Sequence, residues 1–278
     1  MIRRNAHRYS ISAQCACLGI SRSSYYYEAK PPRDETALEK AVQTAFEENR
    51  CLYGSRKLKR VLATRGIILS GRKICQIMRR LGLESAYTCR KYRSHTKKVN
   101  DAATANLLDR QFDDQVQLAA VVGDLTYVRV GAKWHYICIL LDLHNREIIG
   151  FSSGAHKDAA LVYTAFASVK VNLARIQMFH TDRGCEFDNL LIDELLETFG
   201  IRRSLSLRGC PYDNAVAEAT FKLIKTEFVN RRSFHTPEQL ALELADYVHW
   251  FNHFRIHGAL GFMSPLQFKL HSLSFLCG

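Results

Sequence analysis

Three acidic residues occupy positions where an acidic side chain suggests chemistry. Asp124 lies inside the apolar, β-branched stretch VVGDLTYV, where an uncompensated carboxylate costs stability. Asp182, in HTDRGCEF, closely follows the predicted strand QMFH, at the carboxyl end where open α/β sheets place their ligands. Glu218 lies on a predicted helix, in DNAVAEATFKLIKTE. Each also has a structural interpretation: a hydrogen-bonded strand Asp, a turn or capping Asp, and a surface Glu helped by Lys222.

Together, the three carboxylates fit phosphodiester chemistry. Cleavage and transfer of phosphodiesters need hard cations that activate the attacking oxygen and stabilise the leaving one. Magnesium takes oxygen ligands and few protein contacts, so two or three carboxylates suffice. No serine, tyrosine or histidine nucleophile arrangement stands out as a rival. The sequence therefore predicts a site built from Asp124, Asp182 and Glu218.

Other polar residues of this region are interpreted as structural. Asp142, in LLDLHNRE, ends a predicted strand, where an Asp commonly serves a turn. Glu186 and Glu227 are expected at the surface. Zinc binding is not favoured for three histidines that recur every four residues, because a glycine follows the last one and no cysteine lies near: His249, His253 and His257.

The elements that would position these residues lie between about 115 and 270. Apolar and β-branched runs predict three successive strands, the first two joined by a short turn at 131–133. Alternating helices and strands follow, so a mixed sheet with helices on its faces is expected. The predicted strands are 117–130, 134–141, 147–153, 176–180 and 201–205, and the predicted helices are 158–172, 186–199, 214–229 and 237–251.

The part before residue 115 is predicted to be helical and basic. Residues 1–30 resemble a short helix-turn-helix, with Ser21 capping the second helix, and Pro31 and Pro32 follow as a break. Residues 34–95 predict three helices with apolar faces, and 96–114 a linker. The opposite faces of the helices carry basic side chains suited to phosphate contacts, namely Arg56, Lys57, Arg72, Lys73 and Arg79.

The charge of the chain is uneven. Residues 1–100 hold 22 Lys and Arg against 7 Asp and Glu, whereas the remainder holds 17 against 20. This division favours a module that binds a polyanion, although a well-solvated basic surface has the same composition. No apolar run reaches the roughly 18 residues of a membrane span, and the basic start has no apolar core after it. Nine cysteines without a CxxC pair favour reduced thiols, so a cytoplasmic protein is expected.

The motifs resemble those of a known family. The resemblance is to the integrase-core transposase encoded by the second reading frame (OrfB type) of a large bacterial insertion-sequence family. That family has Asp, Asp and then Glu after 35 intervening residues, the spacing between Asp182 and Glu218 here. HTDRGCEF, DNAVAE and NHFRIHGALGFMSP are similar to its H-S-D-R-G-S-x-Y, D-N-A-x-x-E and closing N-x-x-R-x-H-x-x-L-G-x-x-P. Three positions depart from the pattern and leave every carboxylate in place: Val121, Thr181 and Cys185.

The resemblance implies a fold and a reaction. It implies an α/β, RNase H-like mixed sheet flanked by helices over 115–270, preceded by small all-helical DNA-binding segments. The three carboxylates would hold two Mg²⁺ ions, with Mn²⁺ as an alternative. Cleavage at the ends of the element would be followed by strand transfer into target DNA. Lys225, seven residues after Glu218, stands where the family keeps a basic residue, and Arg255 is a further candidate phosphate contact beside His253 and His257.

The partners implied are double-stranded DNA, both element ends and target, and other copies of the chain, because two ends must be paired. A fusion to an upstream-frame product is a further expectation, and no membrane is expected. Two alternatives stay open at this point. One is a nuclease of the same fold that cleaves without joining, and the other is a DNA-binding regulatory or inhibitory product of the element.

Overall fold

The computed structural model describes residues 2–28, 34–88, 107–108, 116–206 and 215–276. The chain divides into two compact units, Met1–Ala41 and Val42–Gly278. Of the predicted linker, only Leu107 and Leu108 fall within the described residues. None of the described helices is both long enough and apolar enough to cross a membrane.

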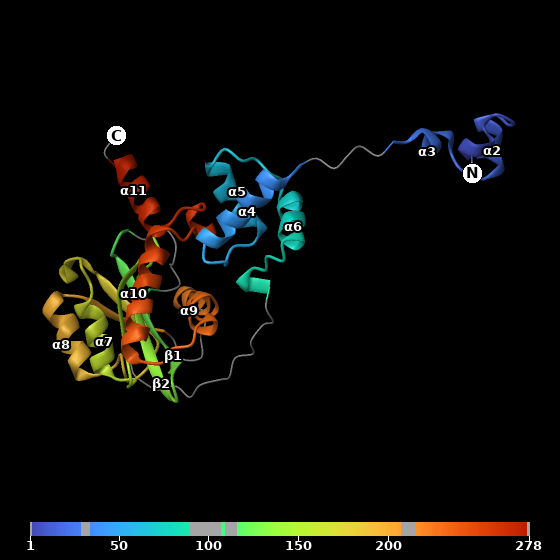
Figure 1. The fold of residues 1–278 in the computed structure, drawn as a ribbon. Helices are drawn as coiled ribbons and strands as arrows, with labels where there is room; N and C mark the ends of the chain where they lie inside the picture. Colours follow the sequence, from blue (N-terminus) through green and yellow to red (C-terminus); the bar gives the residue numbers. More distant parts are fainter. Residues whose placement is uncertain (1, 29–33, 89–106, 109–115, 207–214, 277–278) are drawn as a thin grey trace. The chain divides into compact units, whose positions relative to one another are not determined.

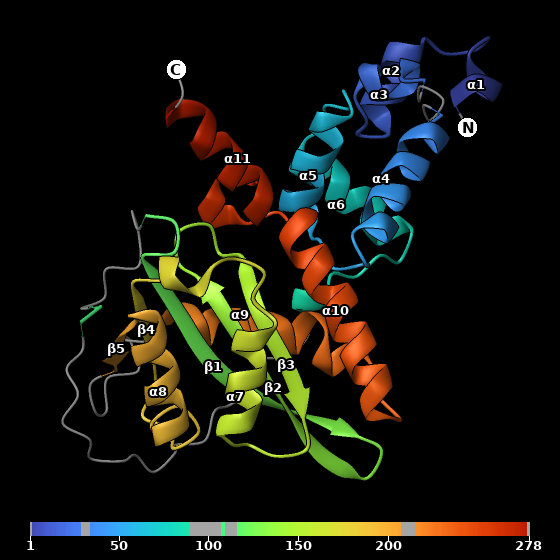
Figure 2. The ribbon, with the colours of Figure 1, turned by 90° about the vertical axis from the view of Figure 1, so that its left-hand side faces the viewer.

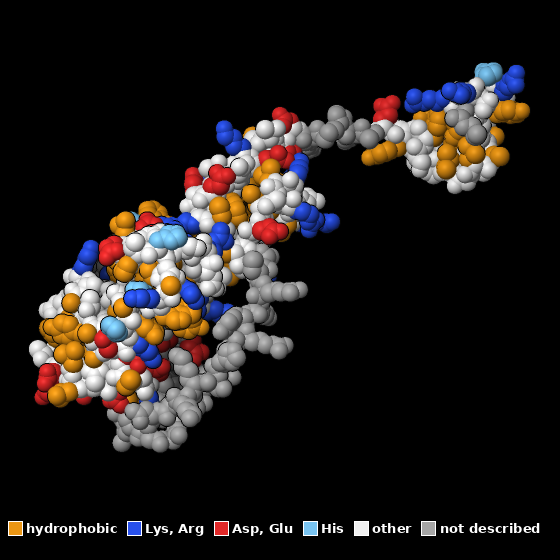
Figure 3. Space-filling view, turned by 60° about the horizontal axis from the view of Figure 1, so that its bottom comes forward, with side chains coloured by type: hydrophobic (Ala, Val, Ile, Leu, Met, Phe, Trp, Pro, Cys, Tyr) orange, Lys and Arg blue, Asp and Glu red, His pale blue; other side chains and the backbone are white. Residues whose placement is uncertain are grey.

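The first unit begins with three short helices, α1 (Ile2–Asn5), α2 (Ile11–Cys17) and α3 (Arg22–Tyr26). Ser10 and Ser21 cap α2 and α3 by accepting hydrogen bonds from the backbone amides of Ala13 and Ser24. The helical pair predicted around Gly19 is therefore present, with Gly19 at a positive φ of 64° between the helices. In Figure 3, Lys and Arg side chains gather along one side of this unit.

Three longer helices follow, α4 (Thr36–Glu48), α5 (Ser55–Thr64) and α6 (Gly71–Arg80), and then the short 3₁₀ helix η1 (Ala86–Thr88). Their apolar positions recur at helical spacing and are buried, as Leu58 and Leu62 are on α5. Ser70 caps α6, and Gly82 follows it at a φ of 65°. The three helices predicted in 34–95 are therefore confirmed.

The remainder of the second unit is built on a mixed five-stranded sheet with the order β3-β2-β1-β4-β5. Its strands are β1 (Ala120–Val130), β2 (Lys133–Asp142), β3 (Ile148–Gly154), β4 (Met178–Thr181) and β5 (Arg202–Leu205). The first three pair antiparallel as hairpins, whereas β4 runs parallel to β1 and β5 parallel to β4. The predicted mixed sheet is therefore the one observed.

Helices cover both faces of this sheet, as Figures 1 and 2 show. α7 (Ala159–Ala167) and α8 (Leu190–Phe199) lie on one face, and α9 (Ala215–Glu227) lies on the other. α10 (Pro237–His253) packs against β3, and α11 (Pro265–Leu276) packs against α10. Short 3₁₀ turns complete the path: η2 (Leu173–Arg175), η4 (Val229–Arg231) and η5 (Gly258–Leu260).

The core between the sheet and α7 and α8 follows the alternation of the strands. Val121 and Leu125 on β1 and Cys138 and Leu140 on β2 point into it, with Phe179 from β4. Successive strand residues point to opposite faces, so Val122, Asp124 and Thr126 point to the other face, which α9 covers. The side on which Asp124 lies is thus set by the apolar pattern of its own strand.

Candidate active site

Asp124 and Asp182 lie at matching positions on neighbouring strands. The parallel ladder pairs Ala120 with Met178, Val121 with Phe179 and Val122 with His180. Continued for two residues, the same register sets Asp124 beside Asp182, just past the end of β4. Neighbouring strands are about 4.8 Å apart, and residues in register point to the same face. The register therefore brings together two positions that lie 58 residues apart in the sequence.

Asp124 is half-buried, and its neighbour Gly123 allows a close approach of strands. A Cβ at Gly123 would come within 2.6 Å of the Phe179 ring, so only glycine fits without a shift. The Asp124 carboxylate accepts a hydrogen bond from the Leu125 amide at 2.7 Å. Asp124 is thus neither fully buried nor fully exposed on its strand.

A tight turn begins at Asp182 and is hydrogen-bonded to the end of the neighbouring strand β5. The Asp182 Oδ1 accepts the Gly184 amide at 3.1 Å, and Arg183 donates to the Ser206 carbonyl at 2.9 Å. The preceding His180 is fully buried, and its ring nitrogens lie 2.8 Å from the Ser204 hydroxyl and 3.1 Å from that of Ser206. These contacts fix the end of β4 against β5 and hold Asp182 in place.

Glu186, expected at the surface, is buried. Its side chain is 2% exposed, and its carboxylate forms an ion pair with the Lys157 amine at 2.6 Å. A Cβ at Gly184 would lie 2.5 Å from the Glu186 carboxylate, so the glycine provides the space for it. Burial lowers the pKa of Lys157, but the carboxylates of Glu186 and Asp182 outweigh that and raise it above its ordinary value. A cation next to Asp182 was not apparent from the sequence, because Lys157 lies far from it along the chain.

Glu218 lies in the first turn of α9 and is exposed. Two contacts show that α9 runs beside β1 in the same direction. The Lys225 amine lies 4.7 Å from the Tyr127 ring centroid, and beyond the helix Phe234 bridges in parallel to Val130. Glu218 lies two helical turns before Lys225 on the same helix.

The described residues contain no group of three or more His, Cys, Asp or Glu side chains arranged to hold a metal ion. Among the described residues, the three candidate carboxylates therefore do not form a closed metal-binding cluster in this structure. The donors nevertheless fit magnesium chemically, because all three are carboxylates near a sheet edge. Asp142 does not join them: it is fully buried and accepts the amides of Leu118 at 3.1 Å and His144 at 3.0 Å.

The basic residues predicted to contact DNA separate into two groups. Arg56, Arg72 and Arg79 are exposed, and Lys73 is half-buried. Lys57 instead turns inward, with its amine 4.6 Å from the Tyr53 ring centroid. Burial and the charge of Arg255 lower the pKa of Lys57 to about 8. The prediction of Lys57 as a phosphate contact is therefore not supported in this conformation.

The prediction that Arg255 contacts DNA is wrong in this structure. Arg255 is 3% exposed and pairs with the buried carboxylate of Glu227 at 2.7 Å. Glu227 also accepts hydrogen bonds from the hydroxyls of Tyr87 and Tyr247. A buried guanidinium needs such partners, and this one has no surface left for a phosphate. The expectation that Glu227 lies at the surface fails for the same reason, and no short spacing in the sequence reveals these distant partners.

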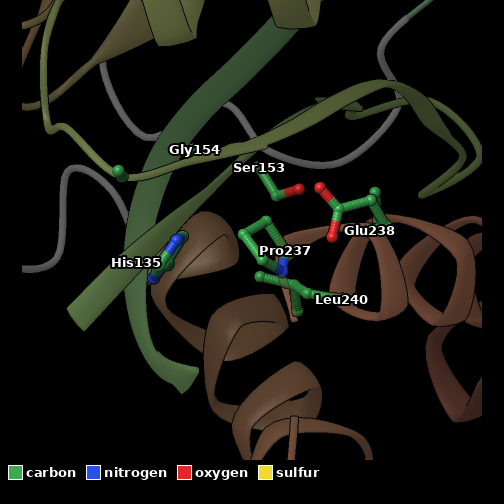
Figure 4. Close-up of a pocket in the computed structure, with 8 residues that line it drawn as sticks. His135, Ser153, Gly154, Pro237, Glu238 and Leu240 are labelled. Atoms are coloured by element: carbon green, nitrogen blue, oxygen red, sulfur yellow. The ribbon is translucent and has the colours of Figure 1, made fainter. Parts of the chain in front are cut away.

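The structure also contains a cavity of about 330 Å³ away from the carboxylates. Figure 4 shows it between the hairpin strands and the start of α10, with His135, Ser153, Pro237, Glu238 and Leu240 around it. None of its lining residues is Asp124, Asp182 or Glu218. It does not belong to the candidate active site.

Family models match most of the chain. Two models of the integrase core domain match residues 117–211 and 218–273, and an HTH-like domain matches 32–92. The chain is 29% identical over 288 residues to the transposase InsF for insertion sequence IS3A of Escherichia coli K12, covering 98% of each chain. It is 26% identical over 247 residues to the transposase for insertion sequence element IS904 of Lactococcus lactis, covering 88% of this chain and 98% of the other.

Among solved structures, the chain is similar to the HTLV-2 integrase catalytic core domain in complex with magnesium. The identity is 16% and the TM-score 0.42, with 55% of this chain and 97% of that chain covered. The catalytic core domain of BIV integrase matches at 17% identity and a TM-score of 0.41, with 58% and 99% covered.

The mixed sheet, its flanking helices and the matched domains define an integrase-core enzyme of the DDE transposase and integrase class. Within that class, the chain is similar to insertion-sequence transposases, with an HTH-like domain ahead of the integrase core.

Proposed function

We propose that this DNA transposase cleaves phosphodiesters at the ends of its element and transfers the freed strands into target DNA. The observation that supports the proposal is the register of β1 and β4, which continued for two residues pairs position 124 with position 182, together with the packing of α9, the helix of Glu218, against β1. Water attacks a phosphodiester at the element end and frees a 3′-hydroxyl. That hydroxyl then attacks a target phosphodiester, without a covalent enzyme intermediate.

The chain's own residues bind and orient the DNA in this proposal. Asp124, Asp182 and Glu218 would hold two Mg²⁺ ions, or Mn²⁺, which supply activation of the attacking oxygen and stabilisation of the leaving one. Lys225 lies about 10 Å along α9 from Glu218 at the helical rise per residue, where its amine can contact a phosphate near the site. Arg56, Arg72, Lys73 and Arg79 hold DNA at the HTH-like domain.

Assembly on DNA follows from the reaction. Two element ends must be brought together before both are joined to one target, so we propose that the chain acts as a multimer on DNA. Fusion to an upstream-frame product would add contacts to this assembly. Size measurement of the protein with and without a duplex carrying an element end tests the multimer, and a monomer on each duplex contradicts it.

Replacement of Asp182 tests the proposed reaction. We expect wild-type protein to join a labelled element-end oligonucleotide to target DNA with Mg²⁺ and not with a chelator. Asp182→Asn should lose joining by at least about a thousandfold while still binding DNA, because it removes a charged ligand at the reacting phosphate. Asp246→Asn is the matched control, since the Asp246 side chain is exposed on α10.

Each result of this assay separates the proposal from its alternatives. Equal joining by wild type and Asp182→Asn contradicts the carboxylate assignment. Cleavage without any joined product indicates a nuclease of the same fold. DNA binding with neither cleavage nor joining indicates a regulatory product of the element.

A further inference from the structure

An aromatic pair is exposed on the hairpin formed by β1 and β2. Tyr127 is 46% exposed and Trp134 is 52% exposed, and their ring centroids lie 5.2 Å apart in an edge-to-face arrangement. The other tryptophan of the chain, Trp250, is buried at 5% exposure. Large rings left in water on two strands do not contribute their usual burial energy to folding, so their exposure suggests contact with another molecule.

Two cations accompany these rings. The Arg129 guanidinium lies 5.6 Å from the Trp134 ring centroid, and the Lys225 amine lies 4.7 Å from that of Tyr127. Cation–π contacts hold the four side chains together and leave ring surface exposed. A surface of aromatic faces with attached cations complements a molecule that has both flat rings and negative charge.

The cluster lies close to the proposed active site along two separate elements. Tyr127 is three residues after Asp124 on β1, about 10 Å along the strand, and its side chain points to the opposite face of the sheet. Lys225 is seven residues after Glu218 on α9, also about 10 Å along a helix. The Lys225 amine contacts the Tyr127 ring, so α9 and β1 meet at the aromatic pair, beyond the residues of β1 that β4 pairs.

We propose that Tyr127 and Trp134, flanked by Arg129 and Lys225, form a stacking surface for unpaired nucleotides of the DNA strand held at the carboxylates. Bases stack on aromatic faces once they are released from the duplex, and the cations contact the phosphates between them. A duplex keeps its bases stacked on one another, so this surface distinguishes an opened DNA end from paired DNA. The inference rests on the proposed function, because it assigns the substrate strand of the same site.

Trp134 itself provides the first test. In a Trp250→Phe background it is the single tryptophan of the chain, so its fluorescence reports on this surface alone. We expect a 12-nucleotide single strand of mixed sequence, added in the presence of a chelator, to quench this fluorescence saturably. The same sequence as a blunt duplex should quench it much less. An unchanged emission with single strand, while the oligonucleotide binds by anisotropy, overturns the proposal.

Variants test the contribution of each ring. Tyr127→Ala and Trp134→Ala should each weaken single-strand binding about tenfold, as loss of one stacked base does, and leave duplex binding unchanged. Tyr163→Ala is the matched control, because Tyr163 on α7 is 48% exposed. Equal losses on single strand and duplex contradict base stacking, and a loss of self-association instead would identify the surface as a contact between copies.

Failure of this inference is distinguishable from failure of the proposed function. Asp182→Asn protein should show the same Trp134 quenching as the wild type, since no metal or reaction is needed. Quenching without joining supports the stacking surface and contradicts the proposed transfer reaction. Joining without quenching supports the transfer reaction and contradicts the stacking surface.

Discussion

Arginine side chains of this chain take opposite roles according to their surroundings. Arg56 and Arg79 are exposed on helices and free to meet phosphate, whereas Arg255 is enclosed with Glu227, Tyr87 and Tyr247. Burial by itself would raise the pKa of Glu227, but the hydrogen bonds and charge of Arg255, with Tyr87, hold that pKa below its ordinary value. The pair remains charged because each side chain supplies the partner that the other needs.

His257 makes this cluster sensitive to acid. Burial, together with the charges of Arg255, Lys57 and Arg146, lowers the pKa of His257 to about 2. The folded protein therefore keeps the ring neutral, and the Arg255 guanidinium donates to a ring nitrogen at 3.2 Å. In the unfolded chain the ring takes up a proton below its ordinary pKa of about 6.5.

Stability should consequently fall as the pH drops below about 6.5, because the unfolded state then binds a proton that the folded state does not. From this residue we expect a loss of about 1.4 kcal/mol in the free energy of unfolding at pH 5.5 relative to pH 7.5. Urea denaturation at the two pH values measures it. His257→Gln should reduce the difference by that amount, and an unchanged pH dependence would refute the assignment. The lowered pKa of Glu227 acts at lower pH, outside this window.

At the scale of elements, close contacts between backbones determine where strands and helices meet. Gly150 on β3 lies against α7: a Cβ there would be 2.6 Å from the Ala165 carbonyl oxygen and 2.7 Å from a Val169 methyl group. Because a helix carbonyl cannot move like the end of a flexible side chain, β3 and α7 would have to separate. Glycine at this position sets the distance between the sheet and its covering helix.

Gly150→Ala should therefore destabilise the fold by about 1–3 kcal/mol, the usual cost of overpacking. Gly71→Ala is the matched control, since nothing lies within 4 Å of a Cβ there and α6 gains a better helix former. Chemical denaturation of both variants measures the free energies of unfolding. A Gly150→Ala protein as stable as the wild type would show that β3 and α7 adapt without cost.

At the scale of the whole molecule, the basic residues proposed to bind DNA and the carboxylates proposed to bind metal lie in different parts of the sequence. The basic excess lies in residues 1–100, and the three proposed ligands lie on or beside the sheet that follows. Phosphate contacts position DNA without reading its sequence, and their number sets the salt dependence of binding. The HTH-like part is thus expected to dominate duplex affinity.

The triple variant Arg56→Ala, Arg72→Ala and Arg79→Ala tests this division. We expect weaker duplex binding and a slope of log affinity against log salt that is smaller by about 3, one for each phosphate contact removed. Arg65→Ala serves as the control, because Arg65 pairs with Glu48 on the neighbouring helix. Binding measured by anisotropy across a salt series gives both slopes, and identical slopes would exclude these three arginines from the DNA contact.

The sequence by itself determined most of the local structure. Apolar periodicity identified the helices and strands of the integrase core, because burying one face imposes a repeat on each element. Capping residues marked their ends: Asp158 begins α7, and Gly200, at a φ of 69°, ends α8. Motif spacing also selected Asp124, Asp182 and Glu218 as candidates, since the family's short signatures surround them.

Only the tertiary structure decided which polar residues meet. Parallel pairing of β1 with β4 brought the strand that holds Asp124 next to the strand that Asp182 follows, and a strand register is a long-range property that neither strand carries alone. Burial likewise turned Arg255 and Glu227 from expected surface residues into an enclosed pair. The exposed rings of Tyr127 and Trp134 gave no sequence signal, because aromatic residues are ordinary in strands. Burial and exposure depend on what packs against a residue, which is decided by the assembled fold.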